Sequence, residues 1–149
     1  MNNDIFSAER LIRKDKIVKA LAASDAEAIL ISDNSNIYYT TGRVINGYTF
    51  INRDGVELFF VRRPVGLSGE GIVYIRKPEN IVEHLSALNI AVPQSLALEL
   101  DTLSYSDTQR LSAAMQSPRM VNGSVLMRRV RSVKTPFEIE KLKESGVRH

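Results

Sequence analysis

The stretch Asp25-Ala26-Glu27-Ala28-Ile29-Leu30-Ile31 decides the fold class, because its last four residues are all apolar. A short unbroken apolar run is typical of a strand covered on both faces, whereas a strand with one face in water alternates apolar and polar residues. The preceding residues 7–23 place apolar side chains at close to a 3.6-residue period, and Ser7 is in position to cap a helix there. A helix followed by a fully buried strand predicts a layered α/β domain.

Further strands and helices are predicted along the rest of the chain. β-Branched and aromatic residues predict strands at 48–53, 56–62, 72–76, 96–100 and 120–121. Helices are predicted at 36–41, 78–88, 106–115 and from 124 onward. Asp54-Gly55 predicts a two-residue hairpin turn with positive φ at both positions. Ser106 and Gln109 match a capping box at the start of their helix, and Gly42 is suited to end the short helix before it.

A last helix start lies close to the C-terminus. Thr135-Pro136-Phe137-Glu138 matches a capping box with proline at the first helical position, and we expect Ile139 and Leu142 to face inward. This helix has little room before the chain stops at His149. We therefore expect more protein to follow it in the parent polypeptide.

The composition excludes several classes of protein. The chain has 149 residues, of which 44% are hydrophobic and 25% charged, as in ordinary globular domains. Because it has no cysteine, it contains no disulfide scaffold, thiolate zinc site or cysteine nucleophile. Its two histidines, at positions 84 and 149, are too few for a histidine-rich metal site. No signal sequence or apolar run of the ~20 residues that a membrane span needs is present, so we expect a cytoplasmic protein.

The positive charge of the chain is confined to one segment. Between Thr108 and Phe137 there are six cations and no acid, a local charge of +6 against +3 for the whole chain, which leaves the remainder at −3. These cations are Arg110, Arg119, Arg128, Arg129, Arg131 and Lys134. A basic segment can bind phosphate backbones, but no aromatic residue is interleaved with it for stacking on bases. We favour a solvated or domain-contacting surface.

Two carboxylates at the end of a predicted strand are candidates for chemistry. Glu99 and Asp101 lie two residues apart and could hold Mg²⁺ or divide the roles of acid and base. The alternative, which we favour, is that they are solvated residues where the strand emerges. His84 is expected to be exposed on its helix. The glycines at 66, 69 and 71 lack both the helix and the lysine of a phosphate-binding loop.

Three arginines are better placed for binding. Arg43 lies in the loop after Gly42, and Arg62-Arg63 ends a predicted strand. The rigid guanidinium fork suits a carboxylate such as a peptide C-terminus, and a nearby tyrosine such as Tyr48 supplies amphipathic contact surface. The alternative is that these arginines are ordinary surface residues.

Five segments in order resemble the N-terminal domain of the creatinase/prolidase/aminopeptidase P family. They are Asp25–Ile31, Asn36–Gly42, Leu58–Val61, Ala97–Asp101 and Arg128–Ile139. The resemblance implies a three-layer α/β fold with a mixed sheet of five or six strands, helices on both faces and a ribonuclease H-like topology. It also implies that residues 1–132 form this domain and that residues 133–149 begin a linker helix into a pita-bread catalytic domain absent from this chain.

The resemblance also implies a function. Relatives are enzymes that cleave peptide bonds next to proline, with two metal ions, often Mn²⁺, held by two Asp, one His and two Glu of the catalytic domain. None of those ligand motifs can be placed here, so we expect neither catalytic residues nor a cofactor in this chain. Relatives use the N-terminal domain to dimerise, and a loop corresponding to residues 43–48 reaches the neighbouring subunit's active site. The expected substrate-side residues are Arg43, Asn46, Tyr48, Arg62 and Arg63.

We therefore expect the non-catalytic N-terminal domain of a metal-dependent Xaa-Pro dipeptidase or aminopeptidase. Its expected partners are its own C-terminal catalytic domain, a second copy in a homodimer and a proline-containing peptide, with neither nucleic acid nor membrane. One alternative is an interaction module of a catalytically inactive relative. Another, less favoured, is a nucleic-acid-binding domain that uses the basic segment.

Overall fold

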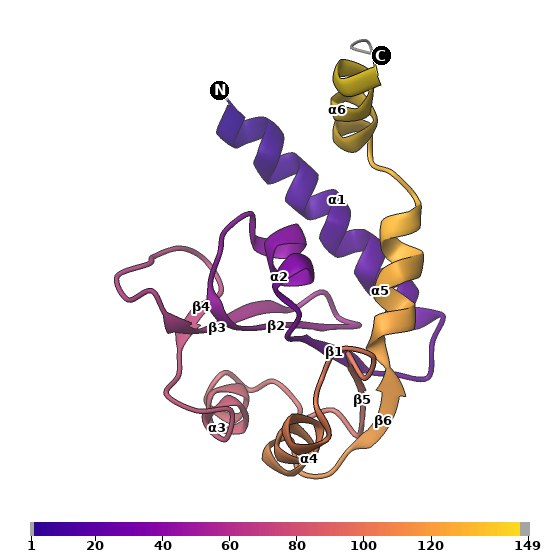
Figure 1. Ribbon diagram of the computed structural model, residues 1–149. Helices are drawn as coiled ribbons and strands as arrows, with labels where there is room; N and C mark the ends of the chain where they lie inside the picture. The colour runs from indigo at the N-terminus through magenta and orange to yellow at the C-terminus, as the bar shows by residue number, and fades with distance from the viewer. Residues whose placement is uncertain (1, 147–149) are drawn as a thin grey trace.

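The computed structural model describes the backbone of residues 2–146 and the side chains of residues 7–144 (Figure 1). His149 lies outside the described residues. The helices are α1 (Asn2–Ala22), α2 (Asn34–Thr41), α3 (Asn80–Ala87), α4 (Tyr105–Ala114), α5 (Gly123–Ser132) and α6 (Pro136–Gly146). The strands are β1 (Ala28–Ile31), β2 (Asn46–Asn52), β3 (Glu57–Arg63), β4 (Ile72–Tyr74), β5 (Ser95–Leu98) and β6 (Arg119–Asn122).

The strands form one mixed sheet of six strands in the order β4-β3-β2-β1-β5-β6. β2 is antiparallel to both neighbours, whereas β4 is parallel to β3, β5 to β1 and β6 to β5. The order β3-β2-β1-β5-β6 is the ribonuclease H-like topology, and β4 extends it at one edge. The predicted mixed sheet is confirmed.

Helices cover both faces of the sheet, which gives three layers. α1, α2 and α5 lie on one face, and α3 and α4 lie on the other (Figure 1). The strand β1 is fully buried because its side chains enter both cores: Ile29 and Ile31 pack with α1 and α5, whereas Ala28 and Leu30 pack with α3 and α4. The apolar run therefore marks a doubly covered central strand, as predicted.

Helix ends differ from the sequence predictions in two places. α1 begins well before Ser7, so Ser7 is not its cap. α4 is capped by Ser104, whose Oγ accepts a hydrogen bond from the Asp107 backbone N–H at 3.0 Å, and not by Ser106. In contrast, Gly42 ends α2 with φ of 72°, in the left-handed conformation that glycine adopts at little cost.

The β2–β3 turn is also longer than predicted. The Gly55 N–H donates to the Asn52 carbonyl at 3.1 Å, and Gly55 has φ of 85°, but Asp54 has no positive φ. This is a turn of three residues with glycine at its last position, in place of the two-residue turn.

Three side chains are exposed differently from the predictions. Ile139 and Leu142 do not face inward, because they are 44% and 55% exposed. His84 is half-buried, with its ring centroid 6.4 Å from that of Phe60. Within residues 2–146, none of the helices is long and apolar enough to cross a membrane.

Candidate functional site

The candidate site lies at the edge of the sheet where β1, β3 and β5 end. The pairing of Asn46 with Arg63 and of Ile31 with Thr49 brings the start of β2 to the same edge. Open α/β sheets bind ligands outside the carboxyl ends of their strands, because loops and helix ends converge there. Four of the five residues predicted to contact substrate, all except Arg43, lie at this edge, which we call the carboxyl edge.

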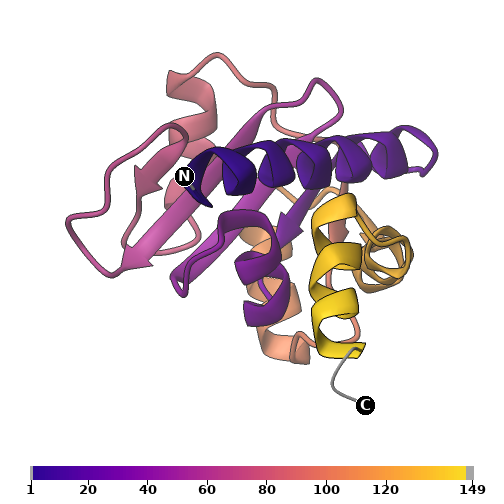
Figure 2. The ribbon, with the colours of Figure 1, turned by 90° about the horizontal axis from the view of Figure 1, so that it is seen from above.

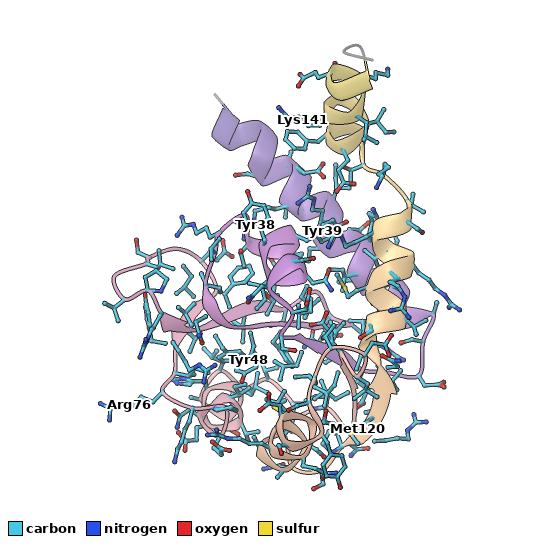
Figure 3. All side chains as sticks on the ribbon, viewed as in Figure 1. Tyr38, Tyr39, Tyr48, Arg76, Met120 and Lys141 are labelled. Atoms are coloured by element: carbon cyan, nitrogen blue, oxygen red, sulfur yellow. The ribbon has the colours of Figure 1, made fainter. Side chains whose placement is uncertain are left out.

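Three of the predicted residues, Asn46, Tyr48 and Arg62, line one cavity of about 380 Å³. Alternation along β2 and β3 turns Tyr48 and Arg62 to the side of α3 and α4, where Figure 3 shows Tyr48. The Arg62 Cζ lies 5.8 Å from the centroid of the Tyr48 ring. Burial raises the pKa of the Tyr48 hydroxyl, and the nearby Arg62 charge opposes that shift. At neutral pH the tyrosine is therefore a neutral hydrogen-bonding group beside a fixed cation.

Arg62 carries an unsatisfied donor. Its Nε atom is buried and has no hydrogen-bond partner among the described residues. A buried donor without a partner is rare in folded proteins and costs stability. The neighbouring Arg110 differs, because it donates from Nε and Nη2 to the two carboxylate oxygens of Glu79, each at 3.1 Å. Because the buried Nε is out of a ligand's reach, the capacity of Arg62 to bind one lies in the rest of the guanidinium, which lines the cavity.

A second, more open cavity adjoins the first. It is lined by Asn46 and Arg63 together with Val44, Pro64 and Val65. Val44 and Val65 are 83% and 81% exposed. The two valines lie on adjacent loops and form a small exposed apolar surface next to the polar cavity. This combination is typical of protein contact sites.

Arg43 lies apart from this cluster. It lines a different cavity of about 580 Å³, between α1 and β3, on the opposite face of the sheet. The structure therefore does not bring Arg43 together with Tyr48 and Arg62, although the sequence predicts all three as substrate-side residues.

Glu99 and Asp101 do not form a shared site. The Glu99 carboxylate is 1% exposed and accepts hydrogen bonds from the backbone N–H groups of Ser32 and Asp33 at 2.6 and 2.8 Å and from Asn36 Nδ2 at 2.6 Å. Glu99 therefore fixes the turn between β1 and α2. Asp101 is exposed, and hydrogen bonds from Asn122 and Arg128 lower its pKa.

These two carboxylates do not fit a metal ion, because protein donors occupy the oxygens of Glu99 and a cation already pairs with Asp101. Within the described part of the chain, no group of three or more His, Cys, Asp or Glu side chains could hold a metal ion. The carboxyl edge is thus a surface of arginine, tyrosine and amide groups, suited to binding and positioning polar or anionic groups.

The sequence profile of the creatinase/prolidase N-terminal domain matches residues 13–133. The chain belongs to this family. The match confirms the resemblance found in the five ordered segments.

Solved structures with the same fold include two chains much longer than this one and one of similar length. The Xaa-Pro dipeptidase from Bacillus anthracis is 21% identical over 91% of this chain and 39% of that one, with a TM-score of 0.69. The prolidase from Pyrococcus furiosus is 21% identical over 85% of this chain and 40% of that one, with a TM-score of 0.62. An aminopeptidase P from Streptococcus thermophilus is 20% identical over 82% of this chain and 98% of that one, with a TM-score of 0.63.

At these identities the likeness shows a shared fold. This creatinase/prolidase N-terminal domain spans about two fifths of the two longer chains and nearly all of the shorter one. A search among curated proteins finds no match.

In this creatinase/prolidase N-terminal domain, the cations of the basic segment are spread over α4, β6, α5 and the α5–α6 connection. Most of them already bind groups of the chain. Arg128 pairs with Asp101 at 2.7 Å, Arg119 donates to the Asp25 carbonyl at 3.2 Å, and Arg131 donates to Ser35 and Asn36. They do not line up as one free basic stripe.

Sequence reasoning missed a buried network at the other end of the domain. Arg13 of α1 donates to Glu9 and to Glu138 of α6. The spacing of Glu9 and Arg13 is that of a helical ion pair and could have been noticed. Their contact with residues 135–138 joins distant parts of the chain and leaves no local signal.

Proposed function

We propose that this domain is the non-catalytic N-terminal part of a metal-dependent Xaa-Pro peptidase, and that its carboxyl edge helps to admit and position substrate at a partner subunit's active site. In this proposal residues 1–132 are the domain and residues 133–149, of which 147–149 lie outside the described part, begin the linker helix. The two divalent ions, often Mn²⁺ in the family, belong to a separate catalytic domain. The family membership of the chain supports this assignment.

The observation that supports the substrate-side role is the Arg62 guanidinium, which lines the cavity beside Tyr48 and has no hydrogen bond or ion pair to any described residue. A guanidinium offers paired donors that match a carboxylate, such as the C-terminus of a short peptide. Because Arg62 is held in a cavity, its cost of ordering on binding is lower than for a freely moving surface arginine. The proposal assigns Arg62 and Tyr48 to the substrate side, with Asn46 and Arg63 at the rim.

The apolar pair Val44 and Val65 supports a role in dimerisation. Their exposure places apolar surface next to Arg63 and Asn46. A second subunit that covers these valines would bring its own active site close to the carboxyl edge. Sedimentation of the chain and of the V44S/V65S variant tests this part: we expect the variant to shift the equilibrium toward monomer.

Kinetics of the parent enzyme test the substrate-side role. The genomic reading frame that contains this domain is expected to encode the two Asp, one His and two Glu of the family's metal centre. In that enzyme, Arg62→Gln should lower kcat/KM for an Xaa-Pro dipeptide about tenfold or more, as expected for the loss of a charge-assisted hydrogen bond. Arg129→Gln, at an exposed arginine of α5, is the matched control and should leave kcat/KM within about twofold.

Two results would contradict the proposal. Turnover of an Xaa-Pro dipeptide by the 149-residue chain itself in Mn²⁺, at a rate typical of enzymes, would overturn the non-catalytic role. Equal kinetics of the Arg62→Gln and Arg129→Gln enzymes would overturn the substrate-side role.

An interaction module of an inactive relative is the second candidate, and the exposed Val44 and Val65 favour it as much as they favour a dimer. It predicts a reading frame without the five metal ligands. Measuring Mn²⁺ binding by the parent protein distinguishes the two candidates.

A further inference from the structure

The cavity between α1 and β3 carries opposite charges that do not pair with each other. Arg10 and Lys14 of α1 and Arg43 of the α2–β2 loop line it, and Glu57 of β3 faces them from the sheet. Within residues 7–144, no ion pair within 4.0 Å joins Glu57 to any of these cations, and no side-chain hydrogen bond satisfies its carboxylate. The charged side chains thus line a cavity of about 580 Å³, and no ion pair between them fills it.

Contacts with Thr40 and Phe59 fix the position of the Arg10 guanidinium. Its Nε donates to the Thr40 carbonyl at 3.2 Å, and its Cζ lies 5.3 Å from the centroid of the Phe59 ring. These two contacts fix the guanidinium plane and leave its terminal nitrogens without partners among the described residues. Lys14 follows one helical turn later on the same face of α1. The arrangement presents two cations along one wall.

The floor and the opposite wall of the cavity are apolar. Ile45, Phe59 and Val61 form the floor, and Leu67 and Ile72 approach from the glycine-rich segment between β3 and β4. The acid Glu70 lies exposed on the rim. Burial raises the pKa of Glu57 to about 7, against the opposing effect of Arg10 and Lys14, so this carboxylate lacks a close positive partner.

We propose that this cavity binds a zwitterionic ligand with an apolar side chain, either a free amino acid or a short peptide. The ligand carboxylate lies against Arg10, Lys14 and Arg43, its ammonium group pairs with Glu57, and its side chain packs on Phe59. A ligand with a single charge would pair either with the cations or with Glu57, but not with both. The volume is in the range typical of small-molecule sites. This cavity lies on the opposite face of the sheet from Tyr48 and Arg62. The proposal for it therefore does not depend on whether the carboxyl edge contacts substrate.

Titration of the ¹⁵N-labelled chain with L-leucine and with the dipeptide Leu-Leu tests the proposal. We expect saturable shifts of the amide signals of Glu57 and Gly71 for at least one of them. The one that binds more tightly shows whether the natural ligand is a free amino acid or a peptide. N-acetyl-Leu-Leu and Leu-Leu-amide each lack one terminal charge and should bind about tenfold more weakly, as expected when one charged hydrogen bond is lost.

Variants test the two charged groups of the cavity separately. Glu57→Gln should remove the preference for the free amino group, and Arg43→Gln should reduce the preference for the free carboxylate. Arg129→Gln on the far α5 is the control and should bind as the wild-type chain does. The unmodified and capped ligands test the wild-type chain directly, so the proposal remains falsifiable if a variant fails to fold.

Three outcomes would overturn the proposal. One is the absence of saturable shifts for both ligands up to about 10 mM, a concentration well above the dissociation constant expected for two charged contacts. Another is equal binding of the free and capped dipeptides. The third is shifts confined to Tyr48 and Arg62, which would place the peptide at the carboxyl edge alone.

Discussion

Arg13 and Glu138 lie 125 residues apart in the sequence, yet the Arg13 Nη2 donates to the Glu138 carboxylate at 3.1 Å. The same guanidinium donates from Nε to Glu9 at 2.8 Å and from Nη1 to the Tyr39 carbonyl at 2.9 Å, and it lies 4.4 Å from the centroid of the Tyr39 ring. The Glu9 carboxylate also accepts a hydrogen bond from the Thr135 hydroxyl. One arginine therefore links α1, α2 and the start of α6, and Figure 2 shows the ribbons of these three helices from above.

Replacing Arg13 should be strongly destabilising. Arg13→Met leaves the Glu9 carboxylate, which is 2% exposed, without its cation, and removing one partner of a buried pair costs about 3–5 kcal/mol. Urea unfolding followed by circular dichroism measures the loss. Lys19→Met is the matched control, because the Asp15–Lys19 pair is exposed and should change the free energy of unfolding by less than about 1 kcal/mol. Equal midpoints for the two variants would contradict a structural role for the network.

The pKa of Glu57 predicts a stability that falls as the pH rises. Its pKa is about 7 in the folded chain against an ordinary value of 4.5, so the folded state binds the proton more tightly than the unfolded state. The favourable contribution is complete below pH 4.5 and is lost as the pH rises through 7, with a total of at most about 3 kcal/mol.

Glu57→Gln removes this titration. The variant should be more stable than the wild-type chain at pH 8 and should show a flatter profile of unfolding free energy between pH 5 and 8. Urea midpoints at several pH values measure both effects. A wild-type profile that does not decline relative to the variant over this interval would show that Glu57 is well solvated or well paired.

Glu99 should prove structural and independent of metal. Glu99→Ala removes the acceptor for three donors, two of them backbone N–H groups of the β1–α2 turn. Each buried donor left unsatisfied costs about 1–3 kcal/mol, so with three donors affected the free energy of unfolding should fall by at least about 2 kcal/mol. The melting temperature of the wild-type chain should not respond to Mn²⁺ or to a chelator. A clear metal-dependent stabilisation that Glu99→Ala abolishes would restore the metal-site hypothesis.

Short-range signals predicted much of the fold. The apolar run at 28–31, the glycine after α2 and the capping box at Thr135 and Glu138 depend on neighbours within a few residues, and all three are confirmed. The sequence misplaces the α4 cap because Ser104 and Ser106 are both acceptable N-cap residues, and in the structure the helix begins directly after the first. Ile139 and Leu142 follow a helical spacing, but that spacing does not say whether a partner covers them.

The candidate site depended on longer-range geometry. Arg62 and Tyr48 come together because β2 and β3 are paired in the register set by the three-residue turn. The predicted two-residue turn shifts this register by one residue and would turn the two side chains to opposite faces of the sheet. The separation of Arg43 from them depends on the path of the α2–β2 loop around the sheet edge. The cavity that Arg43 shares with Arg10 and Glu57 requires the position of α1 over the sheet, which no local pattern specifies.

Arg62 should show opposite effects on stability and on function. Arg62→Met keeps most of the side-chain length over the Tyr48 ring and removes a buried donor that has no partner among the described residues. Because the unsatisfied donor destabilises the folded chain, its removal should leave the free energy of unfolding unchanged or raise it by about 1 kcal/mol. In the parent peptidase the same change should lower kcat/KM for an Xaa-Pro dipeptide about tenfold, since it removes the cation beside Tyr48. Arg53→Met is the contrasting control: Arg53 donates to the carbonyls of Ala26 and Ser24, so its loss should reduce stability. A large destabilisation by Arg62→Met with unchanged kinetics would make Arg62 a structural residue.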